Sequence, residues 1–249
     1  MMGRVAFVGA GPGAADLVTL RGARLLARAE VVLADALVDP ALRELAPQAR
    51  WIDVGKRGFR PSTSQARIHA LLLRAARAHD LVVRLKGGDP GVFGRLDEEL
   101  EALAGAGIDC EVVPGISAAL AAAADSRLPL TRRGRGRSVA FSTAMTRDAS
   151  LRVGRHADTE VFYMAGRQLG ALGRGLRQAG WEPATAVSVV SRAGCADSLR
   201  SRHRLDELAH AALLHAGRPT VVVVGAGAEA LQAAPAGARL VSILPSPQD

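Results

Sequence analysis

The sequence has few aromatic residues: Phe, Trp and Tyr together make up 3% of its 249 residues. Leu, Val and Ala must therefore fill its interior, and the hydrophobic share of 49% is ordinary for a globular protein. The length allows one large domain or two small ones with cores of their own. No apolar run approaches the roughly 20 residues of a membrane span, so we expect no membrane partner. The start, "MMGRVAFVGAG", lacks the layout of a signal peptide, and we expect a cytoplasmic protein.

Cysteine and metal-binding patterns are also scarce. The two cysteines, Cys110 and Cys195, form no C-x-x-C motif, which favours small buried thiols over a redox role. The six histidines are dispersed, and His210 and His215 are spaced so that they do not share one helix face. We therefore expect no metal site.

The charge is strongly biased to one sign. The net charge is +8, and Lys56 and Lys86 are the only lysines among 32 basic residues. Such an excess indicates an acidic partner, either nucleic acid or a small polyanion. The segment "TRRGRGR" (131–137) is the candidate for nucleic acid, but it has no aromatic residue on which a base would stack. A binding module for nucleic acid is thus the weaker alternative.

Short apolar runs alternate with helical patterns, which predicts an α/β fold with parallel strands and helices on the faces of the sheet. The predicted strands are 4–9, 31–34, 51–54, 80–85, 109–113, 138–142, 159–163, 185–190 and 220–224. The predicted helices are 19–28, 40–46 (with Asp39 as cap), 64–78, 95–105, 168–179 and 205–215. The Gly- and Arg-rich stretch 128–138 divides the chain into two α/β domains, 1–128 and 129–249. A cleft between two domains is a favoured ligand site.

The first glycine-rich loop, "VGAGPG" (8–13), follows the first predicted strand. It fits the dinucleotide pattern G-x-G-x-x-A, and Asp35 stands near the distance at which a carboxylate binds a ribose. Pro12 opposes this interpretation because it has no backbone N–H for a phosphate. In addition, the helix is predicted to begin only near Asp16 or Thr19, after a longer turn. A nicotinamide dehydrogenase is therefore the weaker interpretation of this loop.

The second loop, "RLKGGDPGVFGR" (84–95), is more informative. Gly87 and Gly88 allow a sharp turn and a close approach of the backbone to a ligand. A simple turn between strand and helix has no need of Arg84, Lys86, Asp89 and Arg95 around it. This loop favours a ligand site at the end of the strand.

The segments "VGAGPG", "VLADALV", "VGKR", "VRLKGGDPGVFGR", "EVVPGISAA" and "LPLTRR" together resemble the uroporphyrinogen-III C-methyltransferases. These belong to the S-adenosylmethionine-dependent tetrapyrrole methylases. The resemblance runs from about residue 4 to 225. It implies a two-domain homodimer that transfers two methyl groups to uroporphyrinogen III, giving precorrin-2 for cobalamin- or sirohaem-type biosynthesis. A methyltransferase acting later in the corrin pathway is the alternative within the same class.

The resemblance also implies site residues. The S-adenosylmethionine site would comprise Pro12, Gly87, Gly88, Asp89, Val92, Phe93, Ser117, Ala118, Met164, Ala193 and Thr220. Asp35 is the candidate proton acceptor, and Arg95 and Glu98 are marked as active-site residues. The substrate carries eight carboxylates, which Arg side chains bind in bidentate fashion; its site would include Lys56, Arg57, Thr131, Arg132 and Arg133. Thr220 stands where the family more often has Ala. Four further residues depart from the family pattern, which has Tyr, Gly, Gly and His at these places: Ala34, Leu96, Asp97 and Arg132.

Overall fold

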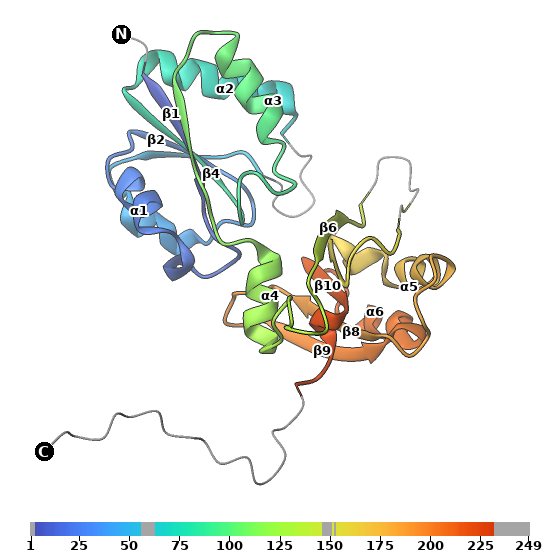
Figure 1. Cartoon of the computed structure of the whole chain (residues 1–249). Coiled ribbons are helices and arrows are strands. Elements are labelled where there is room, and N and C mark those ends of the chain that lie inside the picture. The colour runs from blue at the N-terminus through green and yellow to red at the C-terminus, as the bar shows by residue number, and fades with distance from the viewer. Residues whose placement is uncertain (1–2, 56–62, 146–150, 152, 232–249) are drawn as a thin grey trace, which may run out of the picture.

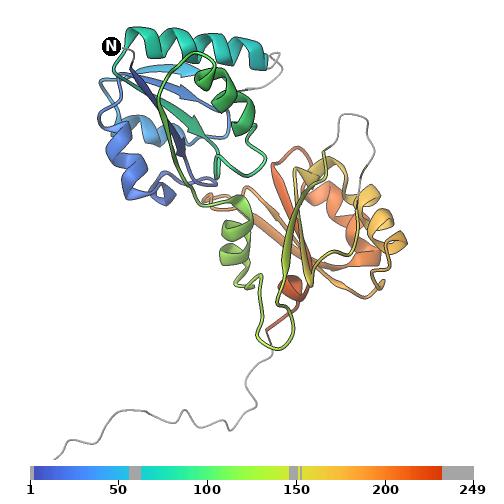
Figure 2. The ribbon, with the colours of Figure 1, turned by 45° about the horizontal axis from the view of Figure 1, so that its top comes forward.

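The computed structural model describes residues 3–55, 63–145, 151 and 153–231. Each half of the chain forms a five-stranded sheet with helices packed against it. The two lobes follow one another along the chain and meet near the helix α4 (Figures 1 and 2). The predicted α/β class with two sheet-containing units is confirmed.

The first lobe holds a wholly parallel sheet with the strand order β3-β2-β4-β1-β5. Its elements are β1 (Arg4–Gly9), η1 (Ala15–Leu17), α1 (Leu20–Leu26), β2 (Val31–Ala34), η2 (Pro40–Leu45), β3 (Arg50–Asp53), α2 (Gln65–Ala78), β4 (Leu81–Lys86), α3 (Leu96–Ala104) and β5 (Cys110–Val113). The helix α1 covers one face of this sheet, and α2 and α3 cover the other (Figure 1). Both faces are therefore buried, which explains the continuous apolar runs of β1 and β2.

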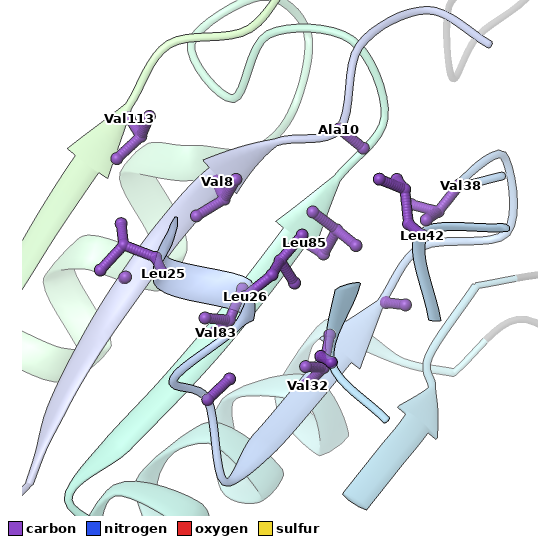
Figure 3. Close-up of a cluster of buried hydrophobic side chains, with 14 of the residues drawn as sticks. Val8, Ala10, Leu25, Leu26, Val32, Val38, Leu42, Val83, Leu85 and Val113 are labelled. Atoms are coloured by element: carbon purple, nitrogen blue, oxygen red, sulfur yellow. The ribbon is translucent and has the colours of Figure 1, made fainter. Parts of the chain in front are cut away.

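Alternating residues of β1 supply the two cores of this lobe. Val8 points to the α1 side and packs with Leu25, Leu26 and Leu85 (Figure 3). Phe7 points to the α2 and α3 side and belongs to the core that includes their apolar residues. This is the period of two that side chains follow along a strand.

Thr19 and Asp39 cap the N-termini of two helical segments, as predicted. Thr19 accepts a hydrogen bond from the amide of Gly22 at 3.1 Å, so α1 begins at Leu20. Asp39 caps the short 3-10 helix η2 by accepting from the amide of Ala41 at 2.9 Å. The stretch between the first glycine loop and Thr19 is a turn with a 3-10 segment. The expectation that no α-helix follows this loop directly is confirmed.

The second lobe differs from the parallel sheet that strand-helix alternation predicts. Its order is β6-β7-β10-β8-β9, and only the β6–β7 pair is parallel. Its elements are α4 (Ala118–Ser126), β6 (Val139–Thr143), β7 (Thr159–Tyr163), η3 (Ala165–Arg167), α5 (Leu169–Gln178), β8 (Ala186–Ser191), β9 (Leu199–Arg204), η4 (Leu205–His210), α6 (Ala211–Leu214), β10 (Thr220–Gly225) and η5 (Ala226–Ala228). The alternation misleads here because β10 inserts between β7 and β8 against the direction of both.

One strand and one α-helix were missing from the sequence prediction. The strand β9 alternates exposed arginines with half-buried Leu199, Ser201 and His203, so it carries no apolar run. Six of the nine residues of the helix α4 are alanine, and its buried alanines pack on β7, β8 and β10. The helix α4 thus packs with the second sheet although it precedes Leu128, and the domain boundary after Leu128 stays a prediction. Within the described ranges, no helix is long and apolar enough to cross a membrane.

Candidate functional site

Three loops meet at the carboxyl edge of the first sheet, after β1, β4 and β5. Gly11 and Gly88 exchange two backbone hydrogen bonds, with N–O distances of 3.3 and 2.7 Å, and both have positive φ (+79° and +70°). A Cβ on Gly9 would lie 2.5 Å from the Cα of Gly115. The glycines of the two motifs are therefore needed to bring the loops this close.

Asp89 ties two of these loops together. Its Oδ1 accepts from the amide of Gly91 at 2.8 Å, and its Oδ2 accepts from the amide of Gly115 at 2.9 Å. Charge-assisted bonds of this kind are among the stronger hydrogen bonds in proteins. Asp89 thus holds the shape of the site as well as lining it.

The first loop also reaches the second lobe. The amide of Ala14 donates to the carbonyl of Gly194 at 2.9 Å, and a Cβ on Gly13 would lie 2.4 Å from the Sγ of Cys195. The amide of Gly194 in turn donates to Asp125 of α4 at 2.9 Å. Gly13, the third glycine of "VGAGPG", is therefore needed for close contact between the lobes rather than for binding a phosphate.

A pocket lies at this junction, and apolar atoms form most of its wall. All eleven residues of the predicted cofactor site line it: Pro12, Gly87, Gly88, Asp89, Val92, Phe93, Ser117, Ala118, Met164, Ala193 and Thr220. They come from both lobes and from six separate segments. The structure brings them together, and their contact with a cofactor stays a prediction.

Sequence reasoning missed five further residues that line this pocket: Leu37, Tyr163, Arg192, Pro219 and Val221. Tyr163 is the only tyrosine of the chain and directly precedes Met164, which was predicted. Arg192 likewise directly precedes the predicted Ala193. Tyr163 and Arg192 could therefore have been found from the sequence as immediate neighbours of predicted site residues.

Three of the few aromatic residues form a cluster around Tyr163, which lines the pocket with Phe93. The Tyr163 ring lies 5.0 Å from the ring of Phe93 and 5.7 Å from that of Phe141, the second in an edge-on arrangement. The hydroxyl of Tyr163 lies 2.6 Å from the Ser117 hydroxyl. Burial raises the pKa of Tyr163. The phenol is therefore neutral and serves as a hydrogen-bonding group in the pocket wall.

A second hollow adjoins the first and shares Pro12, Leu37, Arg192 and Pro219 with it. Arg192 has a positive φ of 52° and donates from Nε to Asp197 at 2.7 Å. The hydrogen bond to Asp197 raises the pKa of Arg192, which keeps the guanidinium charged. One cationic side chain therefore borders both hollows.

Asp35, the candidate proton acceptor, directly follows β2 at the same edge of the sheet. Its Oδ1 accepts from Nη2 of Arg84 at 2.7 Å, and its side chain is 32% exposed. It does not line either hollow, whereas the following residues Ala36 and Leu37 do line the second. Its position is at the rim, and its catalytic role stays a prediction.

Arg84 belongs to a buried charge cluster that also includes Glu99 and Lys86. Arg84 donates to Glu99 from Nε at 3.0 Å and from Nη2 at 3.2 Å, and Lys86 donates to Glu99 at 3.0 Å. Burial opposes ionisation of Glu99, but Arg84 and Lys86 outweigh it and lower the pKa of Glu99. Burial and the nearby Arg84 lower the pKa of Lys86. Glu99 was not predicted, although the stripe Leu96, Glu99 and Leu103 on α3 was a readable signal.

Arg95 and Glu98 form the pair that their spacing predicted. Nε and Nη2 of Arg95 each lie 2.7 Å from a carboxylate oxygen of Glu98. Arg95 has φ +53°, a region unusual for a residue with a side chain, and caps the start of α3. About half of the Arg95 side chain is exposed. The two hydrogen bonds to Glu98 orient the Arg95 guanidinium, and the role of the pair toward substrate stays a prediction.

Three of the predicted substrate residues, Thr131, Arg132 and Arg133, are not at this pocket. Lys56 and Arg57 lie outside the described residues. The hydroxyl of Thr159 donates to the carbonyl of Leu130 at 2.9 Å, so the chain after Leu130 lies at the start of β7, whereas the pocket lies at its end, about 13 Å away.

Thr131, Arg132 and Arg133 therefore do not line this pocket, and their role toward substrate stays a prediction. The reason is that α4 carries the chain away from the pocket before Thr131 is reached. Arg132 instead donates to the carbonyls of Glu229 and Ala230.

The other departures from the family pattern have local explanations. Ala34 ends β2 and is buried, so it presents only a methyl group there. Leu96 and Asp97 begin α3, where an acidic side chain interacts favourably with the positive end of the helix. In the part of the chain that the structure describes, no group of three or more His, Cys, Asp or Glu is placed to hold a metal ion.

The family model of the tetrapyrrole (corrin/porphyrin) methylases matches residues 4–209. The chain belongs to this family. Among curated tetrapyrrole methylases, it is 43% identical over 234 residues to the uroporphyrinogen-III C-methyltransferase of Pseudomonas aeruginosa. The match covers 90% of this chain and 94% of that protein.

Solved structures of tetrapyrrole methylases show the same fold. The uroporphyrin-III C-methyltransferase of Thermus thermophilus, solved with S-adenosyl homocysteine, superposes with a TM-score of 0.78 at 39% identity, covering 90% of this chain and 97% of that one. A cobalt precorrin-4 methyltransferase superposes with a TM-score of 0.79 at 26% identity, covering 91% of this chain and 96% of that one. The fold is thus shared within the family, while the identity is higher to the uroporphyrin-III enzyme.

Proposed function

We propose that this protein is an S-adenosylmethionine:uroporphyrinogen-III C-methyltransferase, which adds two methyl groups to its substrate and forms precorrin-2. The observation that carries the proposal is that eleven predicted residues from both lobes line one pocket, in a chain 43% identical to an enzyme of that name. The product would enter cobalamin- or sirohaem-type biosynthesis.

The residues of the pocket fit a nucleoside joined to a methionine better than they fit a dinucleotide. A phosphate needs several backbone N–H groups or a helix N-terminus. Here Pro12 has no N–H, α1 begins only at Leu20, and the amide of Gly11 is bonded to Gly88. The partly exposed Phe93 and Met164 instead offer apolar surface for a thioether and a base.

When bound, S-adenosylmethionine supplies a sulfonium-activated methyl group. The chain itself must align donor and acceptor, exclude water and accept a proton. Gly87 and Gly88 let the backbone approach the ligand, and Asp89 holds the loops in that shape. Alignment of this kind supplies roughly 7–11 kcal/mol in well-oriented reactions. Asp35 at the rim accepts the proton that the substrate carbon loses on methylation, and Arg95, held by Glu98, orients substrate carboxylates.

Two points of biology belong to the same proposal. We infer that the enzyme acts in the cytoplasm, supported by the scarcity of cysteine, and that it works as a homodimer, supported only by the family resemblance. Its partner is the tetrapyrrole rather than nucleic acid. In support of this, Arg132 of the "TRRGRGR" segment is hydrogen-bonded to backbone carbonyls.

Calorimetric titration of the purified protein with three ligands tests the proposal. S-adenosyl homocysteine is expected to bind, and NAD and random duplex DNA are not. Turnover with uroporphyrinogen III, followed by release of S-adenosyl homocysteine, completes the test. Binding of NAD without binding of S-adenosyl homocysteine would return the site to the dinucleotide interpretation.

A further inference from the structure

The buried charge cluster of Arg84, Lys86 and Glu99 is joined to the rim of the site through the Asp35 carboxylate, which accepts a hydrogen bond from Arg84. Arg84, Lys86 and Glu99 have exposures of 2%, 2% and 1%. Arg84 lies on the central strand β4, between Val83 and Leu85, which pack in the core on the α1 side. Its own side chain points to the opposite face, where α2 and α3 pack. A cation thus occupies a core position of the sheet.

Such a position is costly for a charge. Replacing buried ion pairs by apolar residues of similar volume is often neutral or stabilising, so the cluster is poorly explained by stability alone. Every hydrogen bond of Arg84 fixes its direction. It donates to both oxygens of Glu99, to the carbonyls of Leu33 and Leu85 at 3.4 and 3.2 Å, and to Asp35. The planar guanidinium has little freedom left.

The arrangement of charges explains what this rigidity achieves. Two cations face two carboxylates, and Asp35 is the only one of the four with substantial exposure. Among the residues that the structure describes, Oδ1 of Asp35 is bonded to Arg84 and Oδ2 takes no hydrogen bond. Arg84 therefore holds one oxygen of Asp35, and the other oxygen is available at the rim of the site to accept a proton.

We propose that Arg84, itself held by Glu99, is the positioning residue that orients the Asp35 carboxylate for proton transfer in this enzyme. The role of Arg84 rests on the proposed function of Asp35 as proton acceptor. Arg84 touches no substrate in this scheme. It determines which oxygen of Asp35 faces the reacting carbon, whereas Lys86 contacts Glu99 and not Asp35 and only balances the charge of the cluster.

Matched substitutions separate this role from a merely structural one. Arg84→Met and Lys86→Met each remove one buried cation from Glu99 and leave the other in place. Arg84→Met is expected to lower kcat on the order of 10²-fold, the loss that misplacement of a reacting group produces, with the dissociation constant of S-adenosyl homocysteine nearly unchanged. Lys86→Met is expected to lower the melting temperature similarly while leaving kcat within about threefold of the parent.

Arg84→Lys provides a second variant that keeps the buried charge and should fold if Arg84→Met does not. Its single ammonium group cannot hold Glu99 and Asp35 in the same geometry, so kcat should still fall at least about tenfold. A double-mutant cycle with Asp35→Asn completes the test. In the Asp35→Asn background, either Arg84 substitution should change kcat by less than about threefold.

The possible outcomes are distinguishable. Equal losses of kcat in Arg84→Met and Lys86→Met, or equal losses from the Arg84 substitutions with and without Asp35, would overturn the positioning role. If Asp35→Asn by itself turned over like the parent, the proposed function of Asp35 would fail. In that case a slow Arg84 variant would act by another route.

Discussion

The hydroxyl of Tyr163 lies 2.6 Å from the hydroxyl of Ser117, so the last residue of β7 and the residue before α4 are bonded in the pocket wall. Tyr163 is also the centre of the aromatic contacts with Phe93 and Phe141. The bond therefore joins the helix that enters the second lobe to the sheet on which that helix packs.

Tyr163→Phe removes this bond and keeps the ring. We expect a loss of about 1 kcal/mol in the free energy of unfolding, because the buried Ser117 hydroxyl loses its partner. The dissociation constant of S-adenosyl homocysteine should rise by up to about tenfold. Ser126→Ala is the control, because Ser126 ends α4 away from the pocket and makes only a long bond to Ser188. An equal loss of affinity in both variants would contradict the role of Tyr163.

Gly88→Ala tests the close approach of the second loop. Gly88 has φ +70°, so an alanine there should cost about 1–2 kcal/mol of stability. The new methyl group would also enter the ligand pocket and weaken binding of S-adenosyl homocysteine. Gly180→Ala is the matched control, with φ +91° and no atom within 4 Å of the added Cβ, far from the pocket residues. Gly180→Ala should lose stability only; titration calorimetry of both variants compares them.

The Arg95–Glu98 pair is expected to act as a unit. Arg95→Lys keeps the charge but loses the planar fork, so kcat/KM for the tetrapyrrole should fall while cofactor affinity holds. If Glu98 only orients Arg95, Glu98→Gln should have little further effect once Arg95 is replaced. Strictly additive losses in this cycle would show that the two side chains act independently.

His215 predicts a pH dependence of stability. It is fully buried, and its two ring nitrogens contact the hydroxyls of Ser191 and Ser201 at 2.7 and 2.8 Å. Burial lowers its pKa from the ordinary 6.5. The unfolded chain therefore binds a proton at a pH where the folded protein does not. The contribution of the neutral His215 to the free energy of unfolding is complete above about pH 6.5 and is lost as the pH drops below it.

His215→Asn tests this source of acid sensitivity. The amide keeps a donor for Ser191 but does not titrate, so the slope of the unfolding free energy below about pH 6.5 should become smaller. Denaturant unfolding at several pH values measures it. His203, whose pKa burial also lowers, should retain part of the slope. An unchanged slope in His215→Asn would assign the acid sensitivity to other groups.

The sequence predicts well those features that depend on local patterns. The strands β1 and β4 and the glycine loops after them follow from apolar runs and positive-φ requirements, and so do the caps Thr19 and Asp39. The eleven pocket residues came from a family resemblance that covers both lobes. Residue spacing alone does not bring Met164 or Thr220 beside Pro12.

The remaining features depend on pairing partners that are distant in the chain. The antiparallel second sheet follows from the insertion of β10, which no local pattern shows. The strand β9 has a polar alternation because it lies at an edge. In the sequence, Glu99 does not differ from a surface residue such as Glu98; only the packing of α3 on the sheet brings it to Arg84. Thr131 lies away from the pocket because α4, which was not predicted, carries the chain to the start of β7.

Counting the methyl groups transferred is the most direct test of the central claim. The enzyme is incubated with uroporphyrinogen III and S-adenosylmethionine carrying a ¹³C-labelled methyl group, and the mass of the product is measured by mass spectrometry. The proposed function predicts two labelled methyl groups on each tetrapyrrole at completion. An unmethylated uroporphyrinogen III, together with labelling of a later precorrin supplied in its place, would contradict it and assign the chain to another step of the corrin pathway.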